Sequence, residues 1–521
     1  MYFLNNISGT NDFIEITTNK YFVDKSEFIH KLNGLIRTTD KFICITRPTR
    51  FGKSLNAIML ASYYTKNLDS KNIFDNLNIA KCESYEKHLN KHNVIYMSFN
   101  TGSNVFESYK EYKNYFIDRL TSDIKEYCPD VRPGDLLHEM LDFAYKKTGQ
   151  GFIFIIDEWD YIFTNKKYTS EDRTNFSEFL TGLLKGQPYV ELAYMTGVLP
   201  IAKYFSGSTI NMFREYNALY DPFYESYFGF TQQEVETLCK KQDKVSLEQL
   251  QEWYNGYRTR SGERVYNPMS VYYALSDGEC QNYWGDSVSS LELAGYVQND
   301  IHNIRRDIIK MMAGQSLEVY LPKYTTESPE LVSKEKILSL MVVNGYLTYH
   351  KGFVSIPNKE VMKKFETLLL NPVMGNLTKI LEQSRDLLKA TINMDADKVA
   401  SIIDDVHNKN TSYFEYSDEN SLACIISIAY IAARDKYIIK REDIGGKGRT
   451  DFTFYPLYPT DTAFIIELKT DGSSAENAIQ QIKSRDYESS IDSYFGKKLA
   501  VGIVYDKDSK DKKHKAIIEE I

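Results

Sequence analysis

The sequence has little of what marks secreted or membrane proteins. Six of its 521 residues are cysteine, and they are scattered without a CxxC pair, which argues against a disulfide framework or a cysteine zinc site. The longest nearly apolar run, residues 422–433, is too short to span a bilayer and predicts a buried helix. The N-terminus lacks a basic segment followed by an apolar core. We therefore expect a cytoplasmic protein without a secretory signal or membrane contact.

An excess of basic residues is also absent. Lys and Arg together number 63 and Asp and Glu 71, so the net charge is −8. This balance argues against a uniformly basic protein that coats nucleic acid, but it leaves a local nucleic-acid site open. Aromatic residues reach 14%, which argues against general disorder. At about 150 residues per domain, the length predicts two to four domains.

Histidine is scarce as well, with eight in the chain. His88 and His92 lie four residues apart and could chelate a metal from one helix face. The surrounding KHLNKHN is strongly polar, so we expect a solvated helix face there instead.

Three regions follow from the hydrophobic pattern. In residues 1–215, short apolar segments alternate with longer amphipathic stretches. The apolar segments are residues 41–46, 93–99, 151–156 and 191–199. Strands spaced by helices predict a parallel α/β sheet, and continuous apolar runs fit strands that are buried on both faces.

The middle region, residues 216–375, is richer in helical pattern. Its end predicts a helix, a hairpin around residues 351–352 and a second helix that opens near residues 357–358. Such a combination is typical of a winged-helix-like element. A lid or spacer role is as well supported as contact with nucleic acid.

The third region, residues 376–521, begins with helical pattern and then predicts an α/β domain. Its strands are expected at residues 450–456, 463–469 and 498–505, with a helix from about Ala475.

A phosphate-binding loop is predicted in the first region. The strand at 41–46 runs into RPTRFGKSL, and a helical segment follows, which is the context a P-loop needs. Backbone N–H groups of such a loop and of the helix N-terminus attract phosphate. Lys53 would reach the β- and γ-phosphates, and the Ser54 hydroxyl would hold Mg²⁺. Arg47 stands where the generic motif has its first glycine.

An acidic pair ends a second strand about a hundred residues later. Asp157 fits a ligand of the magnesium shell, and Glu158 fits the carboxylate that polarises attacking water. Together with the GKS loop, this pair favours nucleotide binding over a mere turn and buried strand. Thr196 ends the next expected strand, where it either senses the γ-phosphate or is a simple strand-end polar residue.

A second acidic set lies in the third region. Asp451 is on one strand, and Glu467 and Lys469 on the next, where residues two apart face the same side. Carboxylates are hard ligands for Mg²⁺ or Mn²⁺, and Lys469 could orient a water and stabilise the pentavalent phosphorus. The spacing D-x₁₅-E-x-K is what a PD-(D/E)xK nuclease core requires. The alternative is an exposed strand with a Glu–Lys ion pair.

Neighbouring residues could assist this chemistry. Gln481 and Tyr487, on or just after the following helix, could help to place the lysine or the nucleic-acid backbone. Glu419 could contribute a further carboxylate, and Arg449 adds a basic side chain near phosphate.

The order of the motifs resembles that of the AAA-ATPase-like family, whose members commonly end in a PD-(D/E)xK nuclease-superfamily domain. The motifs are FVDKS (22–26), RPTRFGKSL (47–55), IIDEWD (155–160), MTGVLPIAK (195–203), FGFTQQEV (228–235), WYNGYR (253–258), VYNPMSV (265–271), NGYLTY (344–349) and IPNKEV (356–361). The end of the chain, with GRTDFTFYP, AFIIELK and AENAIQQIKSRDY, is similar too. The resemblance covers nearly the full length.

This resemblance implies a site for each activity. In that family the RPxRFGKS loop replaces the generic P-loop, so Arg47 is no departure, whereas Thr49 and Trp159 stand where other residues are frequent. The resemblance implies ATP at Lys53 and Ser54, with Asp157 and Glu158 serving magnesium and the attacking water, so that Ser54 and Asp157 would hold the metal. Arg47, Arg50 and Gly52 belong to the same loop and are expected to bind the nucleotide too. The resemblance also implies a nuclease triad of Asp451, Glu467 and Lys469, with the metal at Asp451 and Glu467, and Gln481 is the further residue expected to assist catalysis.

The leading hypothesis is an ATP-binding protein and ATPase whose nucleotide state controls a Mg²⁺-dependent nuclease acting on DNA or RNA. One alternative is a nucleotide-gated switch whose C-terminal domain binds without cutting. Another is an ATPase that remodels a partner. The sequence leaves open DNA versus RNA, the oligomeric state and the arginine finger, for which Arg50 and Arg214 are only candidates.

Overall fold

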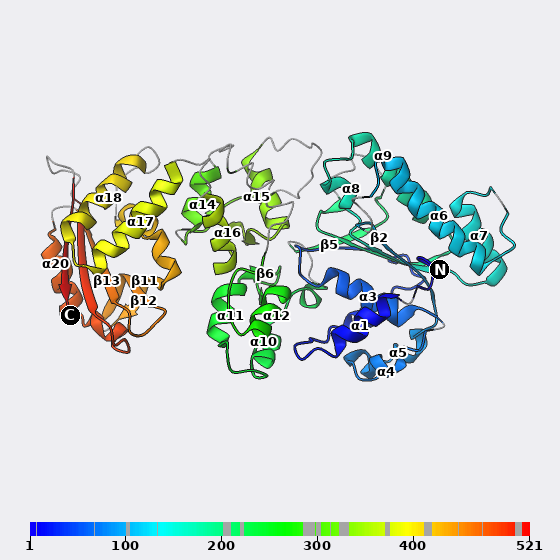
Figure 1. Cartoon of the computed structure of the whole chain (residues 1–521), viewed down its shortest axis with the longest axis horizontal. Helices are drawn as coiled ribbons and strands as arrows, with labels where there is room; N and C mark the ends of the chain where they lie inside the picture. The colour runs from blue at the N-terminus through cyan, green and yellow to red at the C-terminus, as the bar shows by residue number, and fades with distance from the viewer. Residues whose placement is uncertain are drawn as a thin grey trace. The chain divides into compact units, whose positions relative to one another are not determined.

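The computed structural model divides the chain into two compact units. It describes residues 1–6, 8–66, 68–100, 105–132, 134–201, 210–218, 223–284, 297, 304–312, 314–321, 333–369, 376–410, 419–445, 447–470, 473–505 and 513–521. The first unit comprises residues 1–291 and 318–361, and the second comprises residues 292–317 and 362–521 (Figure 1). Each unit contains its own sheet.

A parallel five-stranded sheet forms the centre of the first unit within the described residues. In spatial order its strands are β2 (Asn93–Ser98), β3 (Phe152–Asp157), β4 (Val190–Gly197), β1 (Phe42–Thr46) and β5 (Arg214–Asn217). All four pairings are parallel. This confirms the predicted sheet, and every residue of β3 and β4 is buried, as the apolar runs predict.

Helices cover both faces of this sheet, because successive strand residues point to opposite sides. Phe152 and Phe154 face a cluster with helices α6 (Tyr109–Tyr127), α7 (Leu137–Thr148) and α9 (Ser170–Leu184). Ile153 and Ile155 face the opposite cluster, with α1 (Ser8–Thr17), α2 (Glu27–Asn33) and α3 (Lys53–Tyr64). Figure 1 shows these two helical layers on either side of the strands.

Short elements complete this part of the first unit. They are α4 (Lys71–Phe74), η1 (Asn78–Lys81), α5 (Tyr85–His88), α8 (Tyr161–Thr164) and η3 (Glu225–Tyr227).

The rest of the first unit is mainly helical. It contains α10 (Gln232–Cys239), α11 (Leu247–Tyr254), β6 (Tyr257–Arg258), β7 (Arg264–Val265), α12 (Pro268–Asp277), α15 (Lys334–Val343), β9 (Thr348–His350) and β10 (Phe353–Ser355), with β8 (Leu317–Glu318) and α16 (Lys359–Leu369) at the boundary between the units. The predicted helix, hairpin and helix are present as α15, β9–β10 and α16. Lys351 and Gly352, at φ +47° and +91°, form the turn between the two strands.

The second unit contains a mixed sheet. Its order is β11 (Tyr437–Gly445), β12 (Gly448–Pro456), β13 (Ala463–Thr470), β14 (Lys498–Tyr505) and β15 (His514–Glu520). β13 and β14 are parallel, and the other neighbours are antiparallel. The three strands predicted in this region are present, whereas β11 and β15 were not expected.

Helices pack on both faces of the second sheet as well. They are α14 (Ile304–Met312), α17 (Asn376–Ile392), α18 (Ala396–Asn410), α19 (Glu419–Ala429), η7 (Ile431–Asp435), α20 (Ala475–Ser484) and η8 (Tyr487–Ile491). Leu468 joins the cluster with α17, α18 and α19, whereas Ile465 joins the cluster with α20. By strand alternation, Glu467 and Lys469 lie on the α20 face. The apolar run 422–433 forms most of α19 and η7.

No helix in the described part of the chain is long and apolar enough to cross a membrane.

Candidate functional site

The carboxyl edge of the parallel sheet brings the first set of predicted residues together, because β1, β3 and β4 all end there. The loop after β1 ends at Gly52, whose φ of +84° is left-handed and which directly precedes α3. Lys53 opens this helix, and its buried ammonium donates a hydrogen bond to the Pro48 carbonyl oxygen at 2.8 Å. A tight loop followed by a helix N-terminus is an arrangement suited to phosphate.

Carboxylates surround this lysine. Burial lowers the pKa of Lys53, while the negative charges of Asp160, Asp157 and Glu158 act in the opposite direction. Burial raises the pKa of Asp157, and a hydrogen bond from Ser54 and the charge of Lys53 oppose that rise. Ser54 and Asp157 are therefore neighbours, as a shared magnesium site requires. Burial also raises the pKa of Glu158, whose backbone φ is +51°.

Asp160 is a polar residue of this edge to which the sequence analysis assigned no role. Its buried carboxylate accepts hydrogen bonds from the backbone N–H groups of Val198, at 2.9 Å, and Leu199, at 2.7 Å. A Cβ atom on Gly197 would lie 2.4 Å from Asp160 Oδ1. Asp160 thus ties the end of β3 to the end of β4, and the IIDEWD motif contained this signal.

Thr196 lies beside this connection at the end of β4. Its side chain is fully buried, and the hydroxyl donates to the Ile45 carbonyl oxygen at 3.0 Å. Contact with a γ-phosphate stays a prediction for this residue.

The three arginines proposed for the nucleotide site lie in different surroundings. Arg47 is buried, donates to the carbonyl oxygens of Thr46 and Tyr216 at 3.0 Å each, and so links β1 to β5. Arg50, at φ +69°, donates to the Tyr283 carbonyl oxygen. Arg214 is exposed at the start of β5. Their roles toward phosphate stay predictions.

The second set of predicted residues comes together on β12 and β13. Phe452 pairs with Ile466, so the preceding Asp451 lies beside Glu467 on the neighbouring strand. Asp451 Oδ2 accepts a hydrogen bond of 2.6 Å from the Leu468 backbone N–H. Lys469 Nζ lies 3.0 Å from Glu467 Oε1, and the side chain of the lysine is 19% exposed.

Glu467 is the buried carboxylate of this site. It is 2% exposed, and its buried Oε2 atom has no hydrogen-bond partner among the residues that the structure describes. Burial raises the pKa of Glu467 to about 7, the charge of Asp451 adds to the rise, and Lys469 opposes it. A buried carboxylate oxygen without a partner fits a divalent cation. Among the described residues, no group of three or more His, Cys, Asp or Glu side chains is placed to hold a metal.

The residues predicted to assist lie on the same sheet or on helices of the second unit. Gln481 is half-buried on α20, and Arg449 is exposed on β12. Tyr487 is buried, and its hydroxyl would lie 2.7 Å from a Cβ on Gly448, so it packs against the start of β12. Glu419 is the first residue of α19, and its side chain lies outside the described set.

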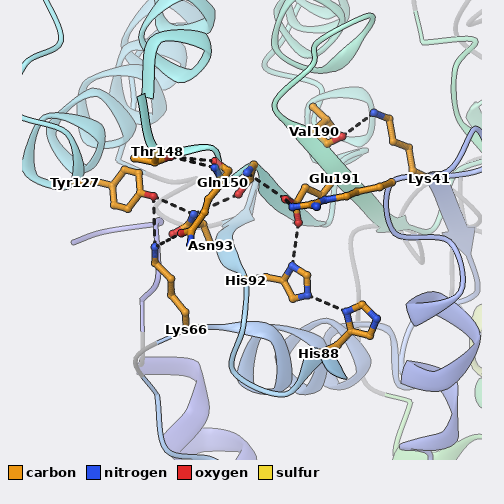
Figure 2. Close-up of polar contacts among 12 residues, drawn as sticks. Lys41, Lys66, His88, His92, Asn93, Tyr127, Thr148, Gln150, Val190 and Glu191 are labelled. Atoms are coloured by element: carbon orange, nitrogen blue, oxygen red, sulfur yellow. Dashed lines mark hydrogen bonds and ion pairs between the residues drawn. The ribbon is translucent and has the colours of Figure 1, made fainter. Parts of the chain in front are cut away.

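The opposite edge of the parallel sheet contains a polar network (Figure 2). Glu191 Oε2 and His92 Nδ1 are 2.9 Å apart, and His92 Nε2 lies 3.0 Å from His88 Nδ1. Glu191 Oε1 accepts from Arg37 at 2.5 Å and from the Gly151 backbone N–H at 3.1 Å. The expected solvated helix face is therefore wrong. His88 is buried and ends the short α5, and His92 lies beyond it, just before β2.

Two protein-family models match separate parts of the chain. Residues 8–205 match the family model described as "Predicted AAA-ATPase", and residues 417–515 match that of the PD-(D/E)XK nuclease superfamily. Curated proteins give no significant match.

Three solved structures are similar over most of their own length, at low scores. A Walker-type ATPase of Pyrococcus abyssi is 11% identical, covers 66% of this chain and 94% of its own, and has a TM-score of 0.33. The ORC2 protein of Aeropyrum pernix with ADPNP and ADP is 10% identical, with 71% and 93% covered and a TM-score of 0.32. The ORC1 protein of the same organism, in complex with DNA, is 11% identical, with 68% and 94% covered and a TM-score of 0.27. From the two family matches, the chain has an N-terminal AAA-ATPase-like domain and a C-terminal PD-(D/E)XK nuclease-superfamily domain.

Proposed function

We propose that the chain binds and hydrolyses ATP and that its nucleotide state controls a metal-dependent nuclease acting on DNA or RNA. The observation that carries the proposal is the buried Glu467 oxygen, which has no partner in the described part of the chain and lies beside Asp451 and Lys469. A strand that served only as a scaffold would gain nothing from burying this oxygen, because an unsatisfied buried acceptor costs about 1–3 kcal/mol.

The nuclease half rests on three side chains. Asp451 and Glu467 would hold Mg²⁺ or Mn²⁺, which when bound lowers the pKa of water and offsets the charge of a phosphate. Lys469, partly exposed beside Glu467, would orient the water and stabilise charge on the phosphate. Gln481 on α20 would help to position the lysine or the nucleic-acid backbone.

The ATPase half rests on the carboxyl edge of the parallel sheet. Lys53 would leave its contact with the Pro48 carbonyl to bind the β- and γ-phosphates, and the loop residues Arg47, Arg50 and Gly52 would surround them. Ser54 and Asp157 would hold the magnesium ion that accompanies ATP, and Glu158 would polarise the attacking water.

The test is a cleavage assay on the purified full chain. Labelled DNA and RNA, single- and double-stranded, are incubated with Mg²⁺, Mn²⁺ or a chelator, and with or without ATP. We expect metal-dependent cleavage that Asp451→Ala abolishes and that responds to ATP in the wild type but not in Lys53→Ala. Asp461→Ala, an exposed aspartate in the turn between β12 and β13, is the matched control. Unchanged cleavage in both Asp451→Ala and Lys469→Ala would refute the nuclease assignment.

A second candidate is a nucleotide-gated switch or partner-remodelling ATPase whose C-terminal domain binds without cutting. The ion pair between Lys469 and Glu467 favours it, since such a pair also suits a purely structural strand. ATP-dependent capture of a partner, without cleavage of any substrate under either metal, would support this reading.

We also propose a division into an ATPase domain at 1–215, a winged-helix-like region at 216–375 and a nuclease domain at 376–521. The location we propose is cytoplasmic.

A further inference from the structure

The loop that precedes Lys53 is enclosed by the helical part of the first unit. Phe51 is 3% exposed, and its ring lies edge-on to that of Tyr257, with the centroids 5.0 Å apart. The Phe51 carbonyl oxygen accepts a hydrogen bond from the Gly229 backbone N–H at 3.3 Å, and a Cβ on Gly229 would lie 3.3 Å from the phenylalanine ring. The side chain of Phe51 is therefore committed to packing.

Pro48, in the same loop, also packs against the helical part of the first unit. A Cβ on Gly345 would lie 2.9 Å from Pro48 Cβ and 2.9 Å from the indole of Trp284, so this glycine permits a close approach. Trp284 is 2% exposed and stacks on Tyr346, with centroids 5.5 Å apart. We call the residues that enclose the loop the collar: Gly229, Tyr257, Tyr283, Trp284 and Gly345.

Arg50 connects the loop to a buried carboxylate through the collar. Its guanidinium donates to the Tyr283 carbonyl oxygen. The Tyr283 backbone N–H donates to Glu360 Oε1 at 2.9 Å, and the Ser270 hydroxyl lies 3.0 and 2.9 Å from the two Glu360 oxygens. The backbone of Tyr283 thus accepts a hydrogen bond from the loop through its carbonyl oxygen and donates one to Glu360 through its N–H group.

Glu360 is fully buried, which is unfavourable for a carboxylate. Burial raises its pKa to about 7, while the Ser270 hydroxyl, the backbone N–H of Tyr283 and the charge of Arg50 oppose the rise. The charge of Glu360 also acts on Tyr254 of α11 and Tyr257 of β6, whose pKa values it helps to raise. The Glu360 carboxylate therefore keeps its hydrogen-bond partners in place, because each partner loses a charge-assisted hydrogen bond if it moves away.

Five of the sequence motifs each supply one residue to this arrangement. FGFTQQEV supplies Gly229, WYNGYR supplies Tyr257, VYNPMSV supplies Ser270, NGYLTY supplies Gly345 and IPNKEV supplies Glu360. Motifs that the ATP site itself does not use therefore meet at the phosphate-binding loop.

We propose that Glu360 is a positioning residue for nucleotide binding: through Tyr283 and Arg50 it holds the loop 47–52 in the conformation that receives the phosphates. The inference rests on the ATP site proposed above. Coupling between two sites is reciprocal, so bound ATP must also stabilise the seating of the collar on the loop.

The first measurement is the affinity of the full chain for Mg²⁺–ATP by calorimetry. We expect Glu360→Gln to raise the Kd roughly tenfold, equivalent to about 1.4 kcal/mol. Glu252→Gln is the matched control, because Glu252 is also a carboxylate but pairs with Lys359, at 3.0 Å, the residue next to Glu360. This variant should keep the wild-type affinity.

The second measurement separates positioning from general stability. Amide hydrogen exchange at Tyr283 and Trp284 should slow when ATP is added to the wild type, and this response should vanish in Glu360→Gln. If Glu360→Gln fails to fold, Ser270→Ala replaces it, with an expected rise in Kd of about threefold because only the hydroxyl bond is lost.

The outcomes distinguish the two proposals. Wild-type protein that binds no ATP refutes the proposed function. If the wild type binds ATP, Lys53→Ala does not, and the Glu360 and Ser270 variants bind as tightly as the wild type with unchanged amide protection, then the ATP site stands and the positioning role is refuted.

Discussion

Asp451 accepts a 2.6 Å hydrogen bond from the backbone N–H of Leu468, the residue between Glu467 and Lys469. Asp451, on β12, is therefore fixed to β13, the strand that carries Glu467 and Lys469. The bond keeps the two carboxylates together although their charges repel, and the repulsion contributes to the raised pKa of Glu467 after burial itself. Asp451 thus has a structural task in addition to the one proposed for it as a metal ligand.

Asp451→Asn and Asp451→Ala should separate these two tasks. An asparagine oxygen can still accept from Leu468, so we expect the free energy of unfolding to change by less than about 1 kcal/mol, whereas alanine leaves the amide unpaired and lowers it by about 1–3 kcal/mol. Both variants should lose cleavage by on the order of 100-fold or more, since a metal ligand is lost. Urea unfolding and the cleavage assay check this, and an active Asp451→Asn would contradict metal binding by this residue.

Mg²⁺ should stabilise the wild type but not Glu467→Gln. A ligand that binds only the folded state adds about 2.7 kcal/mol at a concentration 100 times its Kd. Glutamine lacks the negative charge of the wild-type carboxylate, whose Oε2 atom has no partner among the described residues. Thermal unfolding with and without Mg²⁺ measures the shift, with the wild type in chelator as the reference. Equal Mg²⁺-induced shifts in both proteins would count against a cation at Glu467.

The first unit should lose stability in acid because of the network around Glu191. Burial lowers the pKa of His88 to about 4, and the charges of His92 and Lys87 add to this effect. Burial alone would raise the pKa of Glu191, but hydrogen bonds from His92 and Arg37 outweigh it and hold the pKa at about 2.

The direction of this pH dependence is set by the number of protons that the folded and unfolded chains bind. The ordinary pKa values are 6.5 for His88 and 4.5 for Glu191, and folding lowers both. The unfolded chain therefore binds more protons than the folded chain in the pH range between the two pKa values of each group. The free energy of unfolding therefore falls as pH drops from 6.5 toward 4 through His88, and from 4.5 toward 2 through Glu191. Urea unfolding near neutral pH and at about pH 5 should show a smaller loss in His88→Gln than in the wild type. His138→Gln, on α7, serves as the control, and identical losses in all three proteins would contradict this assignment.

Asp160→Ala should destabilise the first unit by about 2–4 kcal/mol. Two backbone N–H groups, of Val198 and Leu199, would lose their acceptor in a buried place, and each unsatisfied donor costs about 1–3 kcal/mol, less where water enters. Asp172→Ala is the comparison, because this partly exposed carboxylate caps α9 by accepting from the Thr169 backbone N–H and hydroxyl, at 2.9 Å each. Loss of such a cap costs roughly 1 kcal/mol. Urea denaturation measures both, and a similar small loss in the two variants would show that Asp160 does not tie the strands.

In the parallel sheet, the sequence predicted the four strands that are mainly apolar and missed the fifth, which is not. β1, β3 and β4 are buried almost throughout and β2 is mostly buried, so hydrophobicity alone marks them. β5, with the sequence REYN, and β11, with YIIKREDIG, carry charges at the sheet edges and lack that signal.

Catalytic candidates could be predicted because their chemistry is local in sequence. GKS, DE and ExK each fit within a few residues, and Gly52, Asp157 and Glu467 lie at the loop or strand positions expected of them. The environment of a side chain is different, because it depends on segments far away in the chain. His88 and His92 read as solvated from their neighbours, yet they are enclosed by Glu191, about a hundred residues later. The contact of Arg50 with Tyr283 could not be predicted for the same reason.

The two edges of the parallel sheet would respond differently to random mutation. At the amino edge, the side chains around Glu191 bind one another, so a lesion there is expected to give a temperature-sensitive protein that still turns over its substrate when cold. At the carboxyl edge, substitution of Lys53 or Ser54, the residues proposed to bind a ligand, is expected to give a well-folded but inactive protein. A genetic screen at two temperatures would therefore distinguish the residues of the amino-edge network from the proposed ligand-binding residues.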